Sequence, residues 1–181
     1  MIEPMAWMER RFEFDAPVGV FPSLVERLRG TPARAADLVA GCPEDVLAAR
    51  PDGKWSVKEH LGHLADLATL DEKRLAEFLR RVEVLSAADV ENRATEEANH
   101  RQSPIANILK KLRQGRMELT GKLDTLGEEE VSITALHPRL KKPMRLLDWV
   151  YFVAEHDDHH LAKARYTMLR MGTPATRSRG R

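Results

Sequence analysis

Proline and glycine divide this chain into long stretches with apolar residues at helical spacing, and this division constrains the fold more than any other feature. The breaks fall at 17–22, 43, 51–53, 104, 138–143 and 172–174. Between them, apolar residues recur every three, four or seven positions, which is the spacing that buries one stripe of a helix. Strands do not alternate with helices as a parallel sheet requires. The sequence therefore predicts an all-α four-helix bundle.

The first two expected helices differ in how clearly the sequence defines them. The first covers residues 23–39, where Gly30 and Pro32 should bend or break it. The second starts with a capping box, in which Ser56 caps the helix and Glu59, three residues later, reaches back. Its apolar stripe predicts one long helix after this cap.

The remaining segments predict two more helices joined by irregular connections. A long polar connection with a short helix covers 83–103 and leads to the third helix, which starts after Pro104. Residues 128–144 combine β-branched residues with two prolines, and they favour a short extended, hairpin-like excursion. The fourth helix then covers 145–171 and ends before a glycine.

Composition narrows the class of protein. Lysine and arginine (29) nearly balance aspartate and glutamate (28), so no basic field predicts a nucleic-acid partner. No apolar run approaches the ~20 residues of a membrane span, and the start lacks the apolar core of a secretion signal. We therefore expect a cytoplasmic protein without a membrane partner, with a single domain at 1–174 and a basic flexible tail at 175–181.

Histidines on the expected fourth helix can share one ion. His156 and His160 are four residues apart, so they lie within ~40° of each other around the helix. His159 projects away from them, toward solvent. Asp157 projects near the centre of the apolar face, where an unpaired carboxylate is costly, so we expect it to contact a ligand histidine as second-shell support.

The second helix carries His60 and His63, and periodicity does not choose between them. Trp55 precedes the helix, and a staple-like contact would occupy His60 with this ring. That contact leaves His63 freer to bind a metal. A pocket is expected around Trp55, His60 and Trp149, with further residues from 92–102.

A cluster of three neutral imidazoles suits one divalent metal ion, and zinc and nickel are the leading candidates. Three protein ligands leave room for water or substrate, which is the layout of a catalytic site. No catalytic side chain is identified, and the expected reactive species is a metal-bound water or thiolate.

Two stretches, WSVKEHLGHLAD at 55–66 and HDDHHL at 156–161, resemble motifs of the DinB/YfiT-like superfamily. The resemblance implies an up-down-down-up four-helix bundle, often a homodimer, with one metal ion held by one histidine of the second helix and two of the fourth. Carried over residue by residue, these are His63, His156 and His160. Arg74 also resembles a recurrent arginine of the family, but a solvated helix charge explains it equally well.

Some relatives use low-molecular-weight thiols such as bacillithiol or mycothiol, so the resemblance implies a metal-dependent enzyme acting on a small molecule, either a thiol S-transferase or a hydrolase. The alternative is a non-enzymatic stress-related or binding protein with a structural metal. A third hypothesis is an HD-type phosphohydrolase, in which Asp157 would itself bind the metal. A di-iron site needs two Glu-x-x-His elements, and the chain has only Glu97 to His100.

Overall fold

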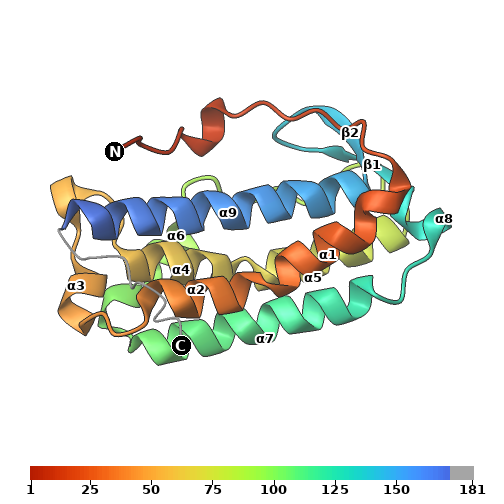
Figure 1. Cartoon of the computed structure of the whole chain (residues 1–181). Helices are drawn as coiled ribbons and strands as arrows, with labels where there is room; N and C mark the ends of the chain where they lie inside the picture. The colour runs from red at the N-terminus through yellow and green to blue at the C-terminus, as the bar shows by residue number, and fades with distance from the viewer. Residues whose placement is uncertain (172–181) are drawn as a thin grey trace.

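Four helical rods lie side by side along one axis within residues 1–171, which the computed structural model describes (Figure 1). Two rods are each broken into two helices and two are continuous. In chain order they are α1 (Phe21–Arg29) with α2 (Thr31–Val39), α4 (Val57–Asp66) with α5 (Ala68–Leu79), α7 (Ile105–Leu123), and α9 (Leu146–Arg170).

The rods follow an up-down-down-up order. Figure 1 shows the first and fourth rods running in one direction and the second and third in the other. Because the second and third rods are parallel, the chain must travel back along the bundle between α5 and α7, and residues 80–104 form this crossover. The predicted all-α four-helix bundle is confirmed.

The first rod breaks at Gly30, as its sequence predicts. In a continuous helix the ring of Pro32 would clash with the carbonyl of the residue four positions earlier, and its nitrogen has no hydrogen to donate. The helix α1 therefore ends at Gly30, and α2 starts with Pro32 in its first turn. Leu28 and Ala35, one on each side of the break, are both fully buried.

The second rod starts as predicted but does not continue as one helix. Ser56 Oγ accepts the Glu59 N–H at 3.2 Å, and Glu59 Oε2 accepts the Ser56 N–H at 2.8 Å, so the capping box is confirmed. Leu67 then interrupts the rod, although its backbone stays near helical values (φ −70°, ψ −11°). The expectation of one long helix is wrong here, and no proline or glycine marks the break.

Short elements connect the rods. They are α3 (Glu44–Ala48), α6 (Arg93–Glu97), α8 (Glu128–Val131), β1 (Thr134–His137), β2 (Lys142–Arg145), and 3-10 turns at Trp7–Glu9, Val18–Val20, Pro51–Gly53 and His100–Gln102. The strands β1 and β2 pair antiparallel, which confirms the predicted hairpin. Val84 of the crossover forms a parallel bridge to Leu136, so the crossover is attached to the hairpin.

A buried layer of charge separates two apolar clusters in the bundle. One cluster lies toward the hairpin and includes Phe78, and the other lies toward α3 and includes Leu64. Between them Arg116 of α7 donates to Asp71 of α5 at 2.8 Å and to Asp157 of α9 at 2.6 Å. These charges tie three rods together, because each carboxylate would be costly to bury alone.

The N-terminal segment crosses the outer side of α9 before α1 begins (Figure 1). Trp7 packs against Phe152 and His156, with ring centroids 5.0 and 4.8 Å apart. Arg10 forms an ion pair with Glu155 and anchors the segment. None of the helices within residues 1–171 is long and apolar enough to cross a membrane. The expected tail at 175–181 lies outside the described residues.

Candidate metal centre

Packing of α4 against α9 brings three histidines together. Ring nitrogens of His63, His156 and His160 all lie within 4.8 Å of one another. His63 comes from the capped start of the second rod, and the other two lie one turn apart on the fourth. The structure thus assembles the three side chains that the sequence analysis selected as metal ligands.

Hydrogen bonds on the outer nitrogens orient two of these rings. His63 Nδ1 lies 3.0 Å from Thr95 Oγ1, which leaves Nε2 facing the cluster. His160 Nδ1 lies 3.1 Å from His60 Nδ1, and this also leaves Nε2 facing inward. The expected contact of Trp55 with His60 is present, with ring centroids 5.5 Å apart. His60 therefore supports His160 rather than lining the cavity.

A chain of polar groups fixes the tautomer of His63. The hydroxyl of Thr95 donates to Asp66 Oδ2 at 3.2 Å, and His100 Nε2 lies 2.7 Å from the same oxygen. Since the Thr95 proton is directed to Asp66, its oxygen accepts the Nδ1–H of His63. The lone pair of His63 is then on Nε2, where a metal would need it.

Gly62 makes this supporting chain possible. A Cβ at this position would lie 2.3 Å from Cγ of the His100 ring, closer than side chains pack. The absence of a side chain lets His100 lie directly on α4 and reach Asp66.

The histidines of the cluster are neutral at ordinary pH. Burial lowers the pKa of His63 to about 4, and it lowers the pKa values of His156 and His160 well below 6.5. Nearby histidines further disfavour protonation of His156 and His160. Neutral imidazole is the form that binds metal.

The residues fit a divalent ion. Nε2 of His156 and Nε2 of His160 are only 3.1 Å apart. Two lone pairs at this distance repel unless the Nε2 proton of one neutral ring or a cation lies between them. Three imidazole nitrogens converging on one point suit zinc or nickel.

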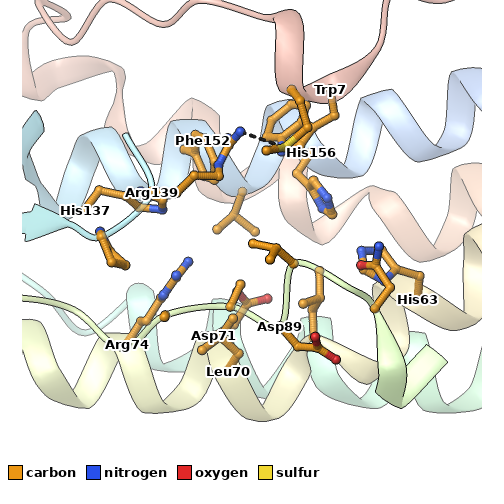
Figure 2. A pocket seen from close by; sticks show the side chains of 18 of the residues that line it. Trp7, His63, Leu70, Asp71, Arg74, Asp89, His137, Arg139, Phe152 and His156 are labelled. Carbon is orange, nitrogen blue, oxygen red and sulfur yellow. Dashed lines mark hydrogen bonds between the residues drawn. The ribbon is translucent and has the colours of Figure 1, made fainter. Parts of the chain in front are cut away.

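The cluster lies at one end of a cavity of about 710 Å³. Figure 2 shows His63 and His156 facing each other at one end, and Arg74, His137 and Arg139 gathered at the other. The walls come from α9, from the second rod, from residues 87–92 of the crossover, from the hairpin, and from the N-terminal segment. Such a volume accommodates a small organic molecule.

Several sequence expectations about side-chain positions need correction. Asp157 does not contact a ligand histidine, because both of its oxygens accept hydrogen bonds from Arg116, at 2.9 and 2.6 Å. This pairing also removes the basis of the HD-type hypothesis. Trp149 does not line the pocket, since it is fully buried in the apolar core and packs on Phe78 at 5.8 Å. Trp55, in contrast, does line the cavity.

Two other side chains lie where sequence reasoning did not place them. His159 is only 9% exposed, because Trp7 of the N-terminal segment covers it, with ring centroids 5.6 Å apart. Arg74 is 4% exposed and lines the cavity, so it is no solvated surface charge. Of the region 92–102, Asn92 lines the cavity, whereas Thr95 and His100 support His63 from behind.

An up-down-down-up helical bundle with three clustered histidines at the wall of a large cavity defines the class of this protein, and the comparisons agree. A family model described as the DinB superfamily matches residues 27–164, so the chain belongs to that superfamily. Among curated proteins there is no significant match.

Among solved structures, the chain resembles YfiT from Bacillus subtilis, which is described as a probable metal-dependent hydrolase with an unusual four-helix bundle topology. The TM-score is 0.81 at 21% identity, over 92% of this chain and 95% of that chain. At this identity the likeness establishes the fold alone.

Proposed function

We propose that the protein is a metal-dependent enzyme that holds one zinc or nickel ion on His63, His156 and His160 and acts on a small molecule in the adjoining cavity. The observation that carries this proposal is the convergence of three neutral imidazoles at a cavity wall. A structural zinc site is normally closed by four protein ligands. Among residues 1–171 no further histidine, cysteine, aspartate or glutamate joins the cluster, so a position stays open for a substrate.

The cavity supports chemistry in which the nucleophile is not a side-chain hydroxyl or thiol. Its lining within the described part of the chain contains no serine, threonine or cysteine. A bound divalent ion supplies Lewis-acid chemistry that lowers the pKa of a coordinated water or thiol. We therefore propose either hydrolysis, with water as nucleophile, or S-transfer, with a bacillithiol- or mycothiol-type thiol as cosubstrate.

The protein's own residues would position the reaction and shield it from water. Phe152 and Trp7 form an apolar wall beside His156. Trp55 covers His63 on another side, with ring centroids 5.2 Å apart. A dry wall strengthens electrostatic interactions inside the site.

Metal content and activity together test the proposal. Untagged wild-type protein should contain close to one equivalent of metal by plasma mass spectrometry, and His63→Ala should lose it. His137→Gln, which removes a histidine from the same cavity but not from the cluster, should keep it. The loaded protein is then screened with small esters and amides, and with thiols plus electrophiles.

Each outcome bears on a different part of the proposal. A wild-type protein that binds neither zinc nor nickel when supplied with them rejects the metal centre. Metal that is lost in His63→Ala without any change in activity, but with lower thermal stability, favours the non-enzymatic alternative with a structural metal. The homodimer implied by the family resemblance is a separate proposal, tested by sedimentation equilibrium.

A further inference from the structure

Three basic side chains from separate elements lie at the end of the cavity opposite the histidine cluster, and the exposed Lys141 of the hairpin turn also lines the cavity. Arg74 comes from α5, His137 from β1, and Arg139 from the turn between β1 and β2. Figure 2 shows Arg74 rising from one wall toward the end where His137 and Arg139 lie. None of the three belongs to the metal centre, so this group of basic side chains needs a separate explanation.

His137 presents a buried donor without a partner. The residue is 2% exposed, and its Nδ1 accepts the N–H of Leu140 at 3.2 Å. The proton of the neutral ring is therefore on Nε2. Nε2 is buried and finds no acceptor among the described residues. Burial, with the charges of Arg74 and Arg139, lowers the pKa of this ring to about 4, so it stays a neutral donor.

Arg139 is held in place by weak contacts only. Its Nη1 points at the sulfur of Met8 at 3.1 Å, and thioether sulfur is a poor acceptor. The guanidinium stacks over Phe152 and Trp7, 5.6 and 5.8 Å from the ring centroids. Its Nη2 is buried and has no partner within residues 1–171. This cation is thus oriented but not neutralised.

Arg74 also lacks a carboxylate partner among the described residues. Its Nε and Nη2 both donate to one neutral acceptor, the carbonyl of Ser86, at 3.0 and 2.8 Å. The nearby acids are engaged elsewhere. Asp71 pairs with Arg116 at 2.8 Å, and Glu77 accepts the Ser86 N–H at 2.8 Å. Buried arginines are normally matched by an anion.

Besides Asp71, a second acid lines the cavity wall, and it is also occupied. Asp89 accepts the backbone N–H groups of Glu91 and Arg93, at 3.1 and 2.6 Å. These bonds hold the carboxylate in its own loop. It therefore does not form a salt bridge with either arginine within the described chain.

We propose that Arg74, His137 and Arg139 form an oxyanion subsite that binds a carboxylate or phosphoryl group of the substrate. Two guanidinium groups and one N–H donor match the several acceptor oxygens of such a group. The role of this subsite rests on the proposed function, because the substrate would place its anionic end here and its reacting end at the histidines. The binding of the anion itself does not require the metal.

Calorimetric titration tests the subsite with three probes: butyrate, its neutral counterpart butyramide, and inorganic phosphate. Wild type should bind butyrate or phosphate, and butyramide at least about tenfold more weakly, since charge-assisted hydrogen bonds are lost. Arg139→Gln, in the half-buried hairpin turn, and Arg74→Gln should each weaken anion binding by about tenfold or more. Arg80→Gln removes the same charge from the exposed end of the same rod and should change nothing.

A second background separates this subsite from the metal centre. In His156→Ala/His160→Ala the anion should still bind, with the same dependence on Arg139, even if no metal is present. Anion binding that disappears in this background, or that is unchanged in both arginine variants, overturns the subsite. So does equal affinity for butyrate and butyramide, or no binding of any probe. The stronger of the two anions identifies carboxylate or phosphoryl as the preferred group.

Discussion

The two ends of the cavity are built in opposite ways. At the histidine end, the side chains come from α4 and α9, and hydrogen bonds on the outer nitrogens of His63 and His160 turn their Nε2 atoms toward one point. At the arginine end, two of the three side chains come from a hairpin, and donor hydrogens of His137 and Arg139 find no acceptor within residues 1–171.

This contrast teaches what each end can bind. Converging lone pairs attract a cation, whereas converging donors attract an anion. The charged layer of Arg116 with Asp71 and Asp157 ties the second, third and fourth rods together, and the second and fourth of these carry the histidine cluster and Arg74. A molecule spanning the cavity would thus be held at one end and reacted at the other.

The largest effect on stability is expected in the charged layer of Arg116, Asp71 and Asp157, which ties three rods together. Arg116→Met removes a cation that is 1% exposed and leaves two buried carboxylates unpaired. Losing one partner of a buried ion pair costs about 3–5 kcal/mol. Urea unfolding should show this loss, and it should disturb both metal and anion binding. Arg113→Met, on the exposed face of the same helix, is the control and should stay within about 0.5 kcal/mol.

The second prediction separates the two ends. Thr95→Val keeps the shape of the side chain but removes the acceptor that orients His63. Loss of such support typically lowers metal affinity by about 10–100-fold. Competition with a zinc chelator measures this change, while calorimetry with butyrate should show no change. Thr134→Val, an exposed threonine of β1, is the control. Equal metal affinity in the Thr95 and Thr134 variants would refute the supporting role.

A third prediction concerns a glycine behind the histidine end. Gly62→Ala must displace the His100 ring and should destabilise the fold by about 1–3 kcal/mol through overpacking. Gly121→Ala has no heavy atom within 4 Å of the new Cβ and should instead stabilise α7 by up to about 1 kcal/mol. Thermal unfolding of the two variants should therefore shift in opposite directions. A shift in the same direction contradicts the close packing of His100 on α4.

The smallest effect concerns pH at the arginine end. Burial lowers the pKa of His137 from 6.5 to about 4. Below pH 6.5 the unfolded chain gains a proton that the folded ring refuses until about pH 4, so acidification lowers the free energy of unfolding in this window. One histidine contributes at most about 1.4 kcal/mol per pH unit.

His137→Gln should remove that contribution. Urea titrations of metal-free protein at pH 7, 6 and 5 should show a shallower loss of stability on acidification than in wild type. Thr134→Val again serves as the control, with the wild-type slope. Parallel curves for His137→Gln and wild type would show that burial does not govern the titration of this ring.

Much of the fold could be predicted because short stretches of sequence determine where the rods and the hairpin begin, break or end. The capping box at Ser56, the break at Gly30, and the β-branched hairpin each follow from a few neighbouring residues. The break at Leu67 could not be predicted, since no local residue type requires it.

Parts of the candidate site could be predicted from the sequence where helical spacing alone places the side chains. The sequence did not predict the contacts that arise when one element packs against another. Spacing brought His156 and His160 together, and it placed Asp157 on the buried face without revealing its partner. The sequence did contain an indication of that partner. Arg116 lies in the same buried stripe of its helix as Leu112 and Leu119, and a buried charge needs an oppositely charged partner.

Loop residues carried no comparable signal. Trp7, His137 and Arg139 reach the cavity only because the N-terminal segment and the hairpin fold over the bundle. The projection of the fourth helix places Trp149 near His156 and His160 and so predicts that it lines the pocket, yet Trp149 faces the apolar core around Phe78. A helical projection gives the direction in which a side chain leaves its own helix. It does not show which other segments of the chain pack over that side chain.

The hairpin lies over the bundle, and its strands are anchored in the apolar core by Ala135 and Met144. It supplies no member of the histidine cluster, and it joins the bundle at α8, at the start of α9 and at the Val84 bridge. The sequence of its turn could therefore change, in evolution or by design, without changes in the helices beneath. Under the proposed function, changes in this turn would alter which substrates bind and would leave the histidine cluster intact.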